Sequence, residues 1–96
     1  MKKGYILVRI SITDLELFQK YPPLSSPAME KYGGKYIIRG GKFEIAEGKW
    51  PAERTTLVEF ENFEKAKACY ESIEYGKAKE IRQKSTSTDL ILIEGC

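Results

Sequence analysis

The sequence contains no histidine, and this absence removes several kinds of chemistry before any motif is considered. A serine or cysteine nucleophile activated by histidine, a histidine-ligated haem and a histidine metal site all require an imidazole, so none can be built within one copy of the chain. Cysteine is also scarce: only Cys69 and Cys96 are present, without the spacing of a metal site. We therefore expect two free thiols, no metal and no cofactor.

Long apolar runs and a strong charge of one sign are absent as well. The apolar stretch near the start of the chain is interrupted by Arg9 and Asp14, so neither a secretory leader nor a membrane-spanning segment is expected. Sixteen Lys and Arg are balanced by fourteen Asp and Glu, and no basic block with interleaved aromatic residues stands out. We expect a cytoplasmic protein that binds neither nucleic acid nor a membrane.

What is present is the composition of an ordinary globular protein. Hydrophobic residues make up 42% of the chain and charged residues 31%, over a length of 96 residues. This length is enough for a single two-layer core but not for a core plus a separate substrate domain. We expect one domain over residues 1–96.

Apolar periodicity predicts four strands and two pairs of helical segments. The strands are expected at 5–13, 35–46 with a bend at Gly40-Gly41, 55–60 and 90–93. Helices are expected to begin after the capping residues Asp14, Asn62 and Ser72, and after Ser25 or Ser26 with Pro27 in the first turn. Residues 85–88 are expected to form a solvated connector.

This order of elements is β-α-β-β-α-β, which is typical of an α+β ferredoxin-like sandwich. In that topology the antiparallel sheet has the strand order 4-1-3-2, and helices cover one of its faces. The strand at 90–93 is apolar on both faces, and Tyr5 and Leu7 lie on the second face of the first strand. The uncovered face is therefore expected to meet a second copy of the chain.

Several segments together resemble a known family. They are Tyr32 to Gly41, Glu47 to Pro51, Val58 to Phe60 and Asp89 to Gly95. With them, nearly the whole chain is similar to the domain-of-unknown-function 1330 family, within the dimeric α+β barrel superfamily. The resemblance implies a homodimer whose two sheets face each other as a barrel, with no established activity. The proline-rich segment 22–27 departs from the continuous helix that is more usual in this family.

Three charged residues form the first candidate site. In the expected topology Arg9, Glu59 and Arg39 lie on adjacent strands and on the uncovered face of the sheet. Arginine pairs bidentately with carboxylates, so the cluster could bind an anion inside the barrel. The alternative is a salt-bridge network that sets how the two sheets pair.

Aromatic residues and one arginine form the second candidate site. Its members are Tyr36, Trp50, Tyr70, Tyr75 and Arg82. They could line a pocket for a small planar ligand, with Arg82 holding its anionic group. The alternative is that the tyrosines pack in the core and Trp50 anchors its loop.

Three functions remain open from the sequence. The first is a homodimer that binds a small anionic or aromatic molecule, between sheet and helices or in the barrel. The second is a cofactor-independent monooxygenase or isomerase, as in similar barrels, with Glu59 or a tyrosine as acid or base and with Arg39 and Arg82 orienting the substrate. The third is a purely structural interaction module.

Overall fold

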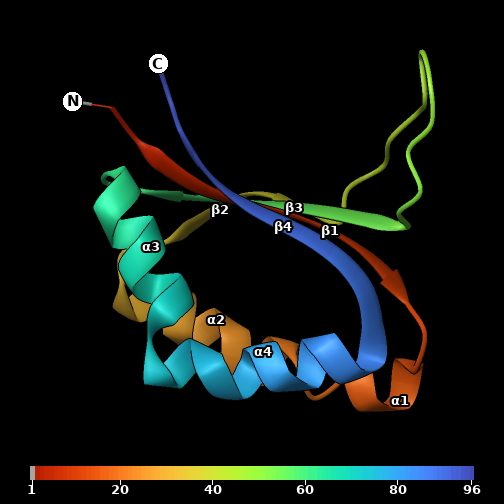
Figure 1. Ribbon diagram of the computed structural model, residues 1–96, viewed down its shortest axis with the longest axis horizontal. Coiled ribbons are helices and arrows are strands. Elements are labelled where there is room, and N and C mark those ends of the chain that lie inside the picture. The colour runs from red at the N-terminus through yellow and green to blue at the C-terminus, as the bar shows by residue number, and fades with distance from the viewer. Residues whose placement is uncertain (1) are drawn as a thin grey trace.

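The computed structural model describes residues 2–96 as a four-stranded antiparallel sheet with four helices on one face (Figure 1). The strands are β1 (Gly4–Ile12), β2 (Lys35–Arg39), β3 (Arg54–Phe60) and β4 (Thr86–Glu94). The helices are α1 (Leu15–Phe18), α2 (Pro22–Lys31), α3 (Phe63–Glu71) and α4 (Ile73–Ser85). The strand order β2-β3-β1-β4 confirms the predicted ferredoxin-like topology.

Side-chain caps begin three of the helices at the residues that the sequence predicts. Asp14, Asn62 and Ser72 each accept a hydrogen bond from the backbone N–H three residues further on, at 3.0, 2.8 and 3.1 Å. Each cap pairs one of the N–H groups that the first turn of a helix leaves free. The boundaries of α1, α3 and α4 thus follow from local chemistry.

Helix α2 begins earlier than expected. Pro22 and Pro23 occupy its first two positions, where a missing N–H costs no hydrogen bond, and Tyr21 precedes them without a side-chain cap. The predicted cap by Ser25 or Ser26 is therefore wrong. Pro27 lies inside the helix rather than in its first turn.

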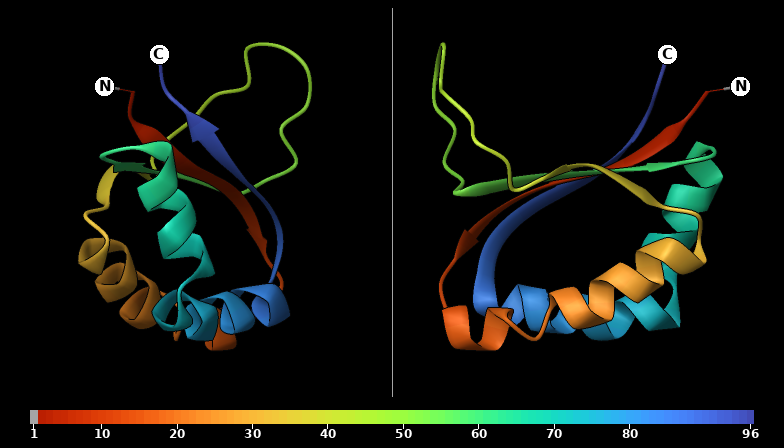
Figure 2. Two further views of the ribbon diagram at one scale, coloured as in Figure 1. Left: turned by 60° about the vertical axis from the view of Figure 1, so that its left-hand side comes forward. Right: turned by 180° about the vertical axis from the view of Figure 1, so that it is seen from behind.

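The predicted continuation of the second strand through residues 42–46 is also wrong. Strand β2 ends at Arg39 because Gly40 adopts a positive φ of 64°, while its N–H still bonds the Thr55 carbonyl at 2.9 Å. Residues 40–53 instead form a long loop that rises on the side of the sheet away from the helices (Figure 2).

Residues 85–88 are not a solvated connector. Ser85 ends α4 in the protein interior, and β4 begins at the next residue. The Ser85 hydroxyl donates to the Ile81 carbonyl at 2.7 Å, and the Ser85 carbonyl accepts the N–H groups of Thr13 and Asp14 at 2.8 and 3.1 Å. Polar residues can be buried here because these groups are paired.

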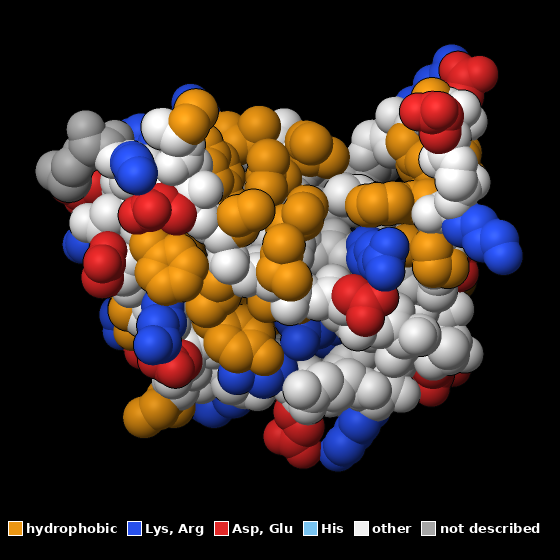
Figure 3. All heavy atoms as spheres, turned by 45° about the horizontal axis from the view of Figure 1, so that its top comes forward, with side chains coloured by type: hydrophobic (Ala, Val, Ile, Leu, Met, Phe, Trp, Pro, Cys, Tyr) orange, Lys and Arg blue, Asp and Glu red, His pale blue; other side chains and the backbone are white. Residues whose placement is uncertain are grey.

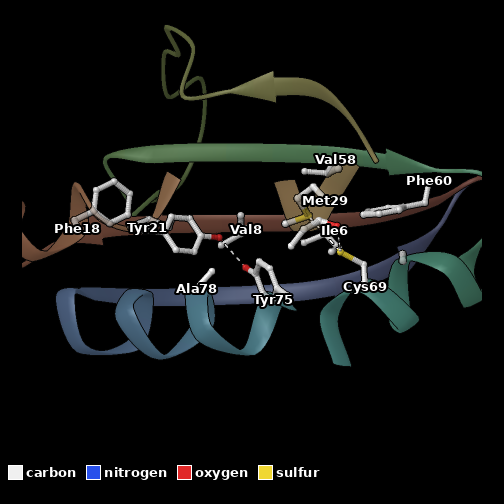
Figure 4. Packing of buried hydrophobic residues seen from close by; sticks show 13 residues of the cluster. Ile6, Val8, Phe18, Tyr21, Met29, Val58, Phe60, Cys69, Tyr75 and Ala78 are labelled. Carbon is white, nitrogen blue, oxygen red and sulfur yellow. Dashed lines mark hydrogen bonds between the residues drawn. The ribbon is translucent and has the colours of Figure 1, made fainter. Parts of the chain in front are cut away.

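The two faces of the sheet differ in environment. The inner face meets the helices and supplies the core, including Ile6, Val8, Ile10, Val58 and Phe60 (Figure 4). On the outer face the strand register aligns one apolar residue from each strand. This apolar row is Ile38, Leu57, Leu7 and Ile91.

Candidate functional site

A cleft lies between the inner face of the sheet and helices α1 and α2. Its volume is about 40 Å³. The lining residues are Val8, Ile10, Phe18, Tyr21, Pro22, Ser25, Met29, Tyr36, Arg39, Arg54 and Thr56. We call this the sheet–helix cleft: it is apolar at its floor and carries two guanidinium groups.

Arg39 reaches the cleft because of an irregularity in β2. The pairing register shifts between Tyr36 and Ile38, which places Arg39 opposite Thr56 on the inner face. Its guanidinium carbon lies 4.1 Å from the centre of the Tyr36 ring, and Nη2 donates to the Ser26 hydroxyl at 2.8 Å. Arg39 is thus held across the cleft between β2 and α2.

Arg54 enters the cleft from the first position of β3. Its guanidinium packs so closely against Gly40 that a Cβ there would lie 2.7 Å from Nη2. Because glycine has no Cβ and tolerates the positive φ, it allows this approach of arginine to backbone. Gly40, the first glycine of the second pair, therefore leaves room for a cleft residue.

Neither cleft arginine has an acidic partner within residues 2–96. The ion pairs of this part of the chain are Lys2–Glu94, Arg9–Asp89, Lys31–Glu74 and Lys84–Glu80. The cleft therefore presents two positive charges whose counter-charge is not supplied by the described carboxylates. Such an arrangement suits a bound carboxylate, which pairs with guanidinium groups through charge-assisted hydrogen bonds.

A hydrogen-bonded chain leads from the cleft into the core. The hydroxyls of Tyr21 and Tyr75 lie 2.7 Å apart (Figure 4). Arg82 Nη1 donates to the Tyr75 hydroxyl at 2.6 Å. Burial raises the pKa of Tyr21, against the opposing effects of Tyr75 and Arg82, and burial likewise raises the pKa of Tyr75. Both phenols therefore stay protonated at neutral pH.

The predicted cluster of Arg9, Glu59 and Arg39 is wrong. Arg39 is on the inner face, whereas Arg9 is on the outer face, where its Nε donates to Asp89 at 3.0 Å. Glu59 lies opposite Tyr5 and accepts a hydrogen bond from its hydroxyl at 3.0 Å. Strand alternation predicted the wrong face for Arg39 because the register shift in β2 moves this residue to the inner face.

The predicted aromatic group is divided between sites. Tyr75 and Arg82 are bonded to each other, and the ring of Tyr70 is 5.8 Å from that of Tyr75. Tyr36 belongs to the sheet–helix cleft. Trp50 lies on the outer face instead, with Arg9 5.0 Å from its ring centre.

Trp50 and Arg9 belong to a shallow pocket of about 210 Å³ on the outer face, with Leu7, Asp89 and Ile91. The Trp50 Nε1 donates to the Thr55 hydroxyl at 3.1 Å, which holds the base of the long loop against β3. Since this pocket contains the Arg9–Asp89 ion pair, its charges are already balanced. It offers a weaker attraction for an anion than the sheet–helix cleft does.

The sites that the sequence suggests leave out Tyr21 and Arg54, which line the cleft, and Ser26, whose hydroxyl accepts a hydrogen bond from Arg39. For Arg54 a signal existed, because alternation along β3 places it on the same face as Val58 and Phe60. The position of Ser26 depends on where α2 begins, and the proline-rich segment made this start difficult to predict.

Comparison with known proteins agrees with this architecture. Residues 3–96 match the family described as "Domain of unknown function (DUF1330)". The chain belongs to this family. No match is found among the curated proteins.

Solved structures show the same fold at low sequence identity. A protein of unknown function from Rhodopseudomonas palustris is 17% identical, with a TM-score of 0.79 over 98% of this chain and 82% of that one. A dimeric ferredoxin-like protein of unknown function from Bacteroides fragilis is 16% identical, with a TM-score of 0.53 over 97% and 95% of the two chains. A protein from Nitrosomonas europaea, provisionally named an antibiotic biosynthesis monooxygenase, is 13% identical, with a TM-score of 0.52 over 96% and 89%.

Two further findings concern residues 2–96 only. No helix in this range is both long and apolar enough to cross a membrane. Nor do three or more His, Cys, Asp or Glu side chains come together there as a group that could hold a metal ion.

Proposed function

We propose that the protein is a homodimer that binds a small organic acid in the sheet–helix cleft, with the carboxylate held by Arg39 and Arg54. The observation that carries this proposal is the pair of guanidinium groups without an acidic partner above an apolar floor. A ligand site of this kind combines apolar walls with a few polar groups that orient the ligand.

Binding would exchange one hydrogen bond for a stronger one. In the free protein Arg39 donates to the neutral Ser26 hydroxyl, and a carboxylate is a better acceptor for guanidinium than a hydroxyl is. The cleft is small, so the carboxylate would sit at its mouth beside Arg39 and Arg54 while a short apolar group contacts the apolar lining.

The dimer part of the proposal is supported by the apolar row on the outer face. Ile38 and Ile91 are 43% and 49% exposed, at the two ends of a row that crosses all four strands. Figure 3 shows hydrophobic side chains gathered over this face with charged groups around them. A contiguous apolar surface rimmed by polar residues is typical of a protein interface, and the Bacteroides fragilis neighbour is described as dimeric.

A monooxygenase-like reaction is the second candidate function, because the Nitrosomonas europaea neighbour is provisionally named as such an enzyme. An acid or base would then be needed in the cleft. Glu59 lies on the outer face, away from it, and Tyr21 has a raised pKa that makes it a poor base. These features favour binding over catalysis.

Calorimetric titration with benzoate and with butyrate tests the proposal. We expect Arg54→Met to weaken binding by about tenfold or more, since a hydrogen bond to a charged group contributes about 1.5–3 kcal/mol. Arg9→Met, which removes the same charge from the outer face, should leave the affinity unchanged. Absence of binding for both acids, or equal affinity in wild type and Arg54→Met, would refute the cleft as the site.

A further inference from the structure

We propose a second ligand site, independent of the sheet–helix cleft, in which buried Arg82 binds a phosphate-type oxyanion. The site lies where the end of α4 meets the start of β4. Its pocket measures about 290 Å³ and is lined by Tyr70, Arg82, Gln83, Thr86, Thr88 and Leu90.

The first argument is an unbalanced charge. Arg82 is only 2% exposed, and no carboxylate of residues 2–96 forms an ion pair with it. Its hydrogen-bond partner is the hydroxyl of Tyr75, which is neutral. An arginine cannot escape burial by losing its proton, so a charge buried in this way is costly unless an anion accompanies it.

Other stabilising contacts do not balance this charge. The guanidinium carbon is 5.8 Å from the centre of the Tyr75 ring, near the limit of a cation–π contact of about 6 Å. Arg82 also lies in the last turn of α4, where the helix end carries only about half a negative charge. About half of the positive charge of Arg82 therefore remains uncompensated.

The second argument is an unpaired donor. Arginine has five N–H groups, and the buried Nε of Arg82 has no hydrogen-bond partner in the described part of the chain. Buried side-chain donors are nearly always paired in folded proteins. Since Arg82 lines the pocket, we infer that its Nε–H turns toward an oxyanion bound there and finds the acceptor that it lacks.

The third argument is the polar character of the surrounding wall. Thr86 and Thr88 lie opposite Ile12 and Ile10 and face the helices, where alternation in β4 otherwise places leucines. Their hydroxyl groups are bonded to each other, and Thr86 also donates to the Arg82 carbonyl. Each hydroxyl has one proton, and with Thr86 donating to the Arg82 carbonyl the Thr88 hydroxyl donates to Thr86, so a bound anion would draw the Thr88 proton away from Thr86 and receive it beside the guanidinium.

A further positive charge lies against one of the lining residues. The Lys79 ammonium lies 3.7 Å from the centre of the Tyr70 ring, and Tyr70 is one of the lining residues. A second cation in contact with a lining residue raises the local concentration of anions. The unbalanced charge of Arg82, its unpaired Nε–H and the polar lining of the pocket therefore all favour the same class of ligand, an oxyanion.

Thermal unfolding of the full chain in increasing phosphate, at constant ionic strength kept with sodium chloride, tests the site. Ligand that binds only the folded state raises the melting temperature in a saturable way. We expect this rise in wild type and at least a tenfold weaker apparent affinity in Arg82→Met. Lys84→Met, which removes the same charge from an exposed position of the same helix, should keep the wild-type response.

The two proposed sites can be distinguished by exchanging probes. Arg54→Met should keep the phosphate response, and Arg82→Met should keep the binding of benzoate. Glycerol 3-phosphate and inorganic phosphate are then compared as probes. Tighter binding of glycerol 3-phosphate would indicate that the site takes the phosphoryl group of a small metabolite, and tighter binding of inorganic phosphate would indicate the free ion. A phosphate response of equal size in wild type and Arg82→Met would overturn the proposal.

A measurement on the unaltered protein covers the case in which Arg82→Met does not fold. In a ¹H–¹⁵N spectrum of the arginine Nε–H groups, the Arg82 signal should shift in a saturable way as phosphate is added. The Arg9 signal, from an exposed ion pair on the outer face, serves as the internal control. An Arg82 signal that does not move would also overturn the site.

Discussion

The hydroxyl oxygens of Tyr21 and Tyr75 lie 2.7 Å apart in the protein interior. Tyr21 precedes α2 and lines the sheet–helix cleft, whereas Tyr75 lies in α4 and accepts a hydrogen bond from Arg82. With its oxygen accepting from Arg82, Tyr75 can donate its own proton to Tyr21. This pair therefore connects the surroundings of the two proposed sites across the helical layer.

Removal of the Tyr75 hydroxyl should cost more stability than removal of its partner hydroxyl. Tyr75→Phe leaves the buried guanidinium of Arg82 without its neutral partner, so we expect a loss of about 1.5–3 kcal/mol in the free energy of unfolding. Tyr21→Phe removes one bond between neutral groups and should cost about 1 kcal/mol. Urea unfolding measures both, and Tyr36→Phe, whose hydroxyl contact is 3.5 Å, is the control. Equal losses of unfolding free energy for Tyr75→Phe and Tyr21→Phe would show that the Tyr75 hydroxyl does not stabilise the buried guanidinium of Arg82.

A charge placed in the apolar row should dissociate the proposed dimer. Leu7 lies between Leu57 and Ile91 at the middle of the row, so Leu7→Lys would bury an unpaired ammonium between the two sheets. We expect wild type to be a dimer and Leu7→Lys a monomer by native mass spectrometry and light scattering. Ile73→Lys, at a position 83% exposed, should remain dimeric. A monomeric wild type would refute the dimer.

Two adjacent glycines should differ sharply in their tolerance of alanine. At Gly40 a methyl group would meet the Arg54 guanidinium at 2.7 Å, and φ is 64°, so we expect Gly40→Ala to cost about 1–2 kcal/mol of stability. Because the clash displaces Arg54, binding of benzoate should weaken as well. At Gly41 nothing lies within 4 Å of the added methyl group, so Gly41→Ala should change neither stability nor affinity. Weakened benzoate binding in both variants would instead indicate that the conformation of the whole loop, and not the contact between Gly40 and Arg54, controls the affinity.

The buried thiol of Cys69 should make stability depend on alkaline pH. Burial raises its pKa from 9.0 to about 11 in the folded protein. The unfolded chain therefore loses this proton first, and stability should fall as the pH rises from about 9 to 11. The difference in unfolding free energy between wild type and Cys69→Ala, followed from pH 8 to 11, isolates this contribution from the tyrosines. A constant difference would contradict the raised pKa.

Much of the fold could be predicted because its signals are local. Alternation along β1 and β3 reports which face each residue occupies, and the caps Asp14, Asn62 and Ser72 mark helix starts through bonds only three residues long. These signals, with the order of elements, were sufficient for the strand order of the sheet. They failed at the proline-rich start of α2, where more than one proline could occupy the first turn of the helix.

The candidate sites were less predictable because they depend on contacts between distant residues. One shifted residue pair in β2 moved Arg39 from the outer to the inner face and separated it from Glu59 and Arg9. The long loop carried Trp50 to the face opposite Tyr75, although both belong to one aromatic group in the sequence. No pattern of period two or 3.6 records a register shift or the path of a loop.

The sequence alone was enough for the topology, for the starts of α1, α3 and α4, and for the chemistry that is excluded by the absence of histidine. Periodicity and capping depend on residues only a few positions apart, so both can be recognised in the sequence without a structure. The three-dimensional structure was needed to show which arginines share a cleft, and that Arg82 is buried with no acidic partner among residues 2–96. Those outcomes depend on packing and on the distance between charges, which are set when segments far apart in the chain come together.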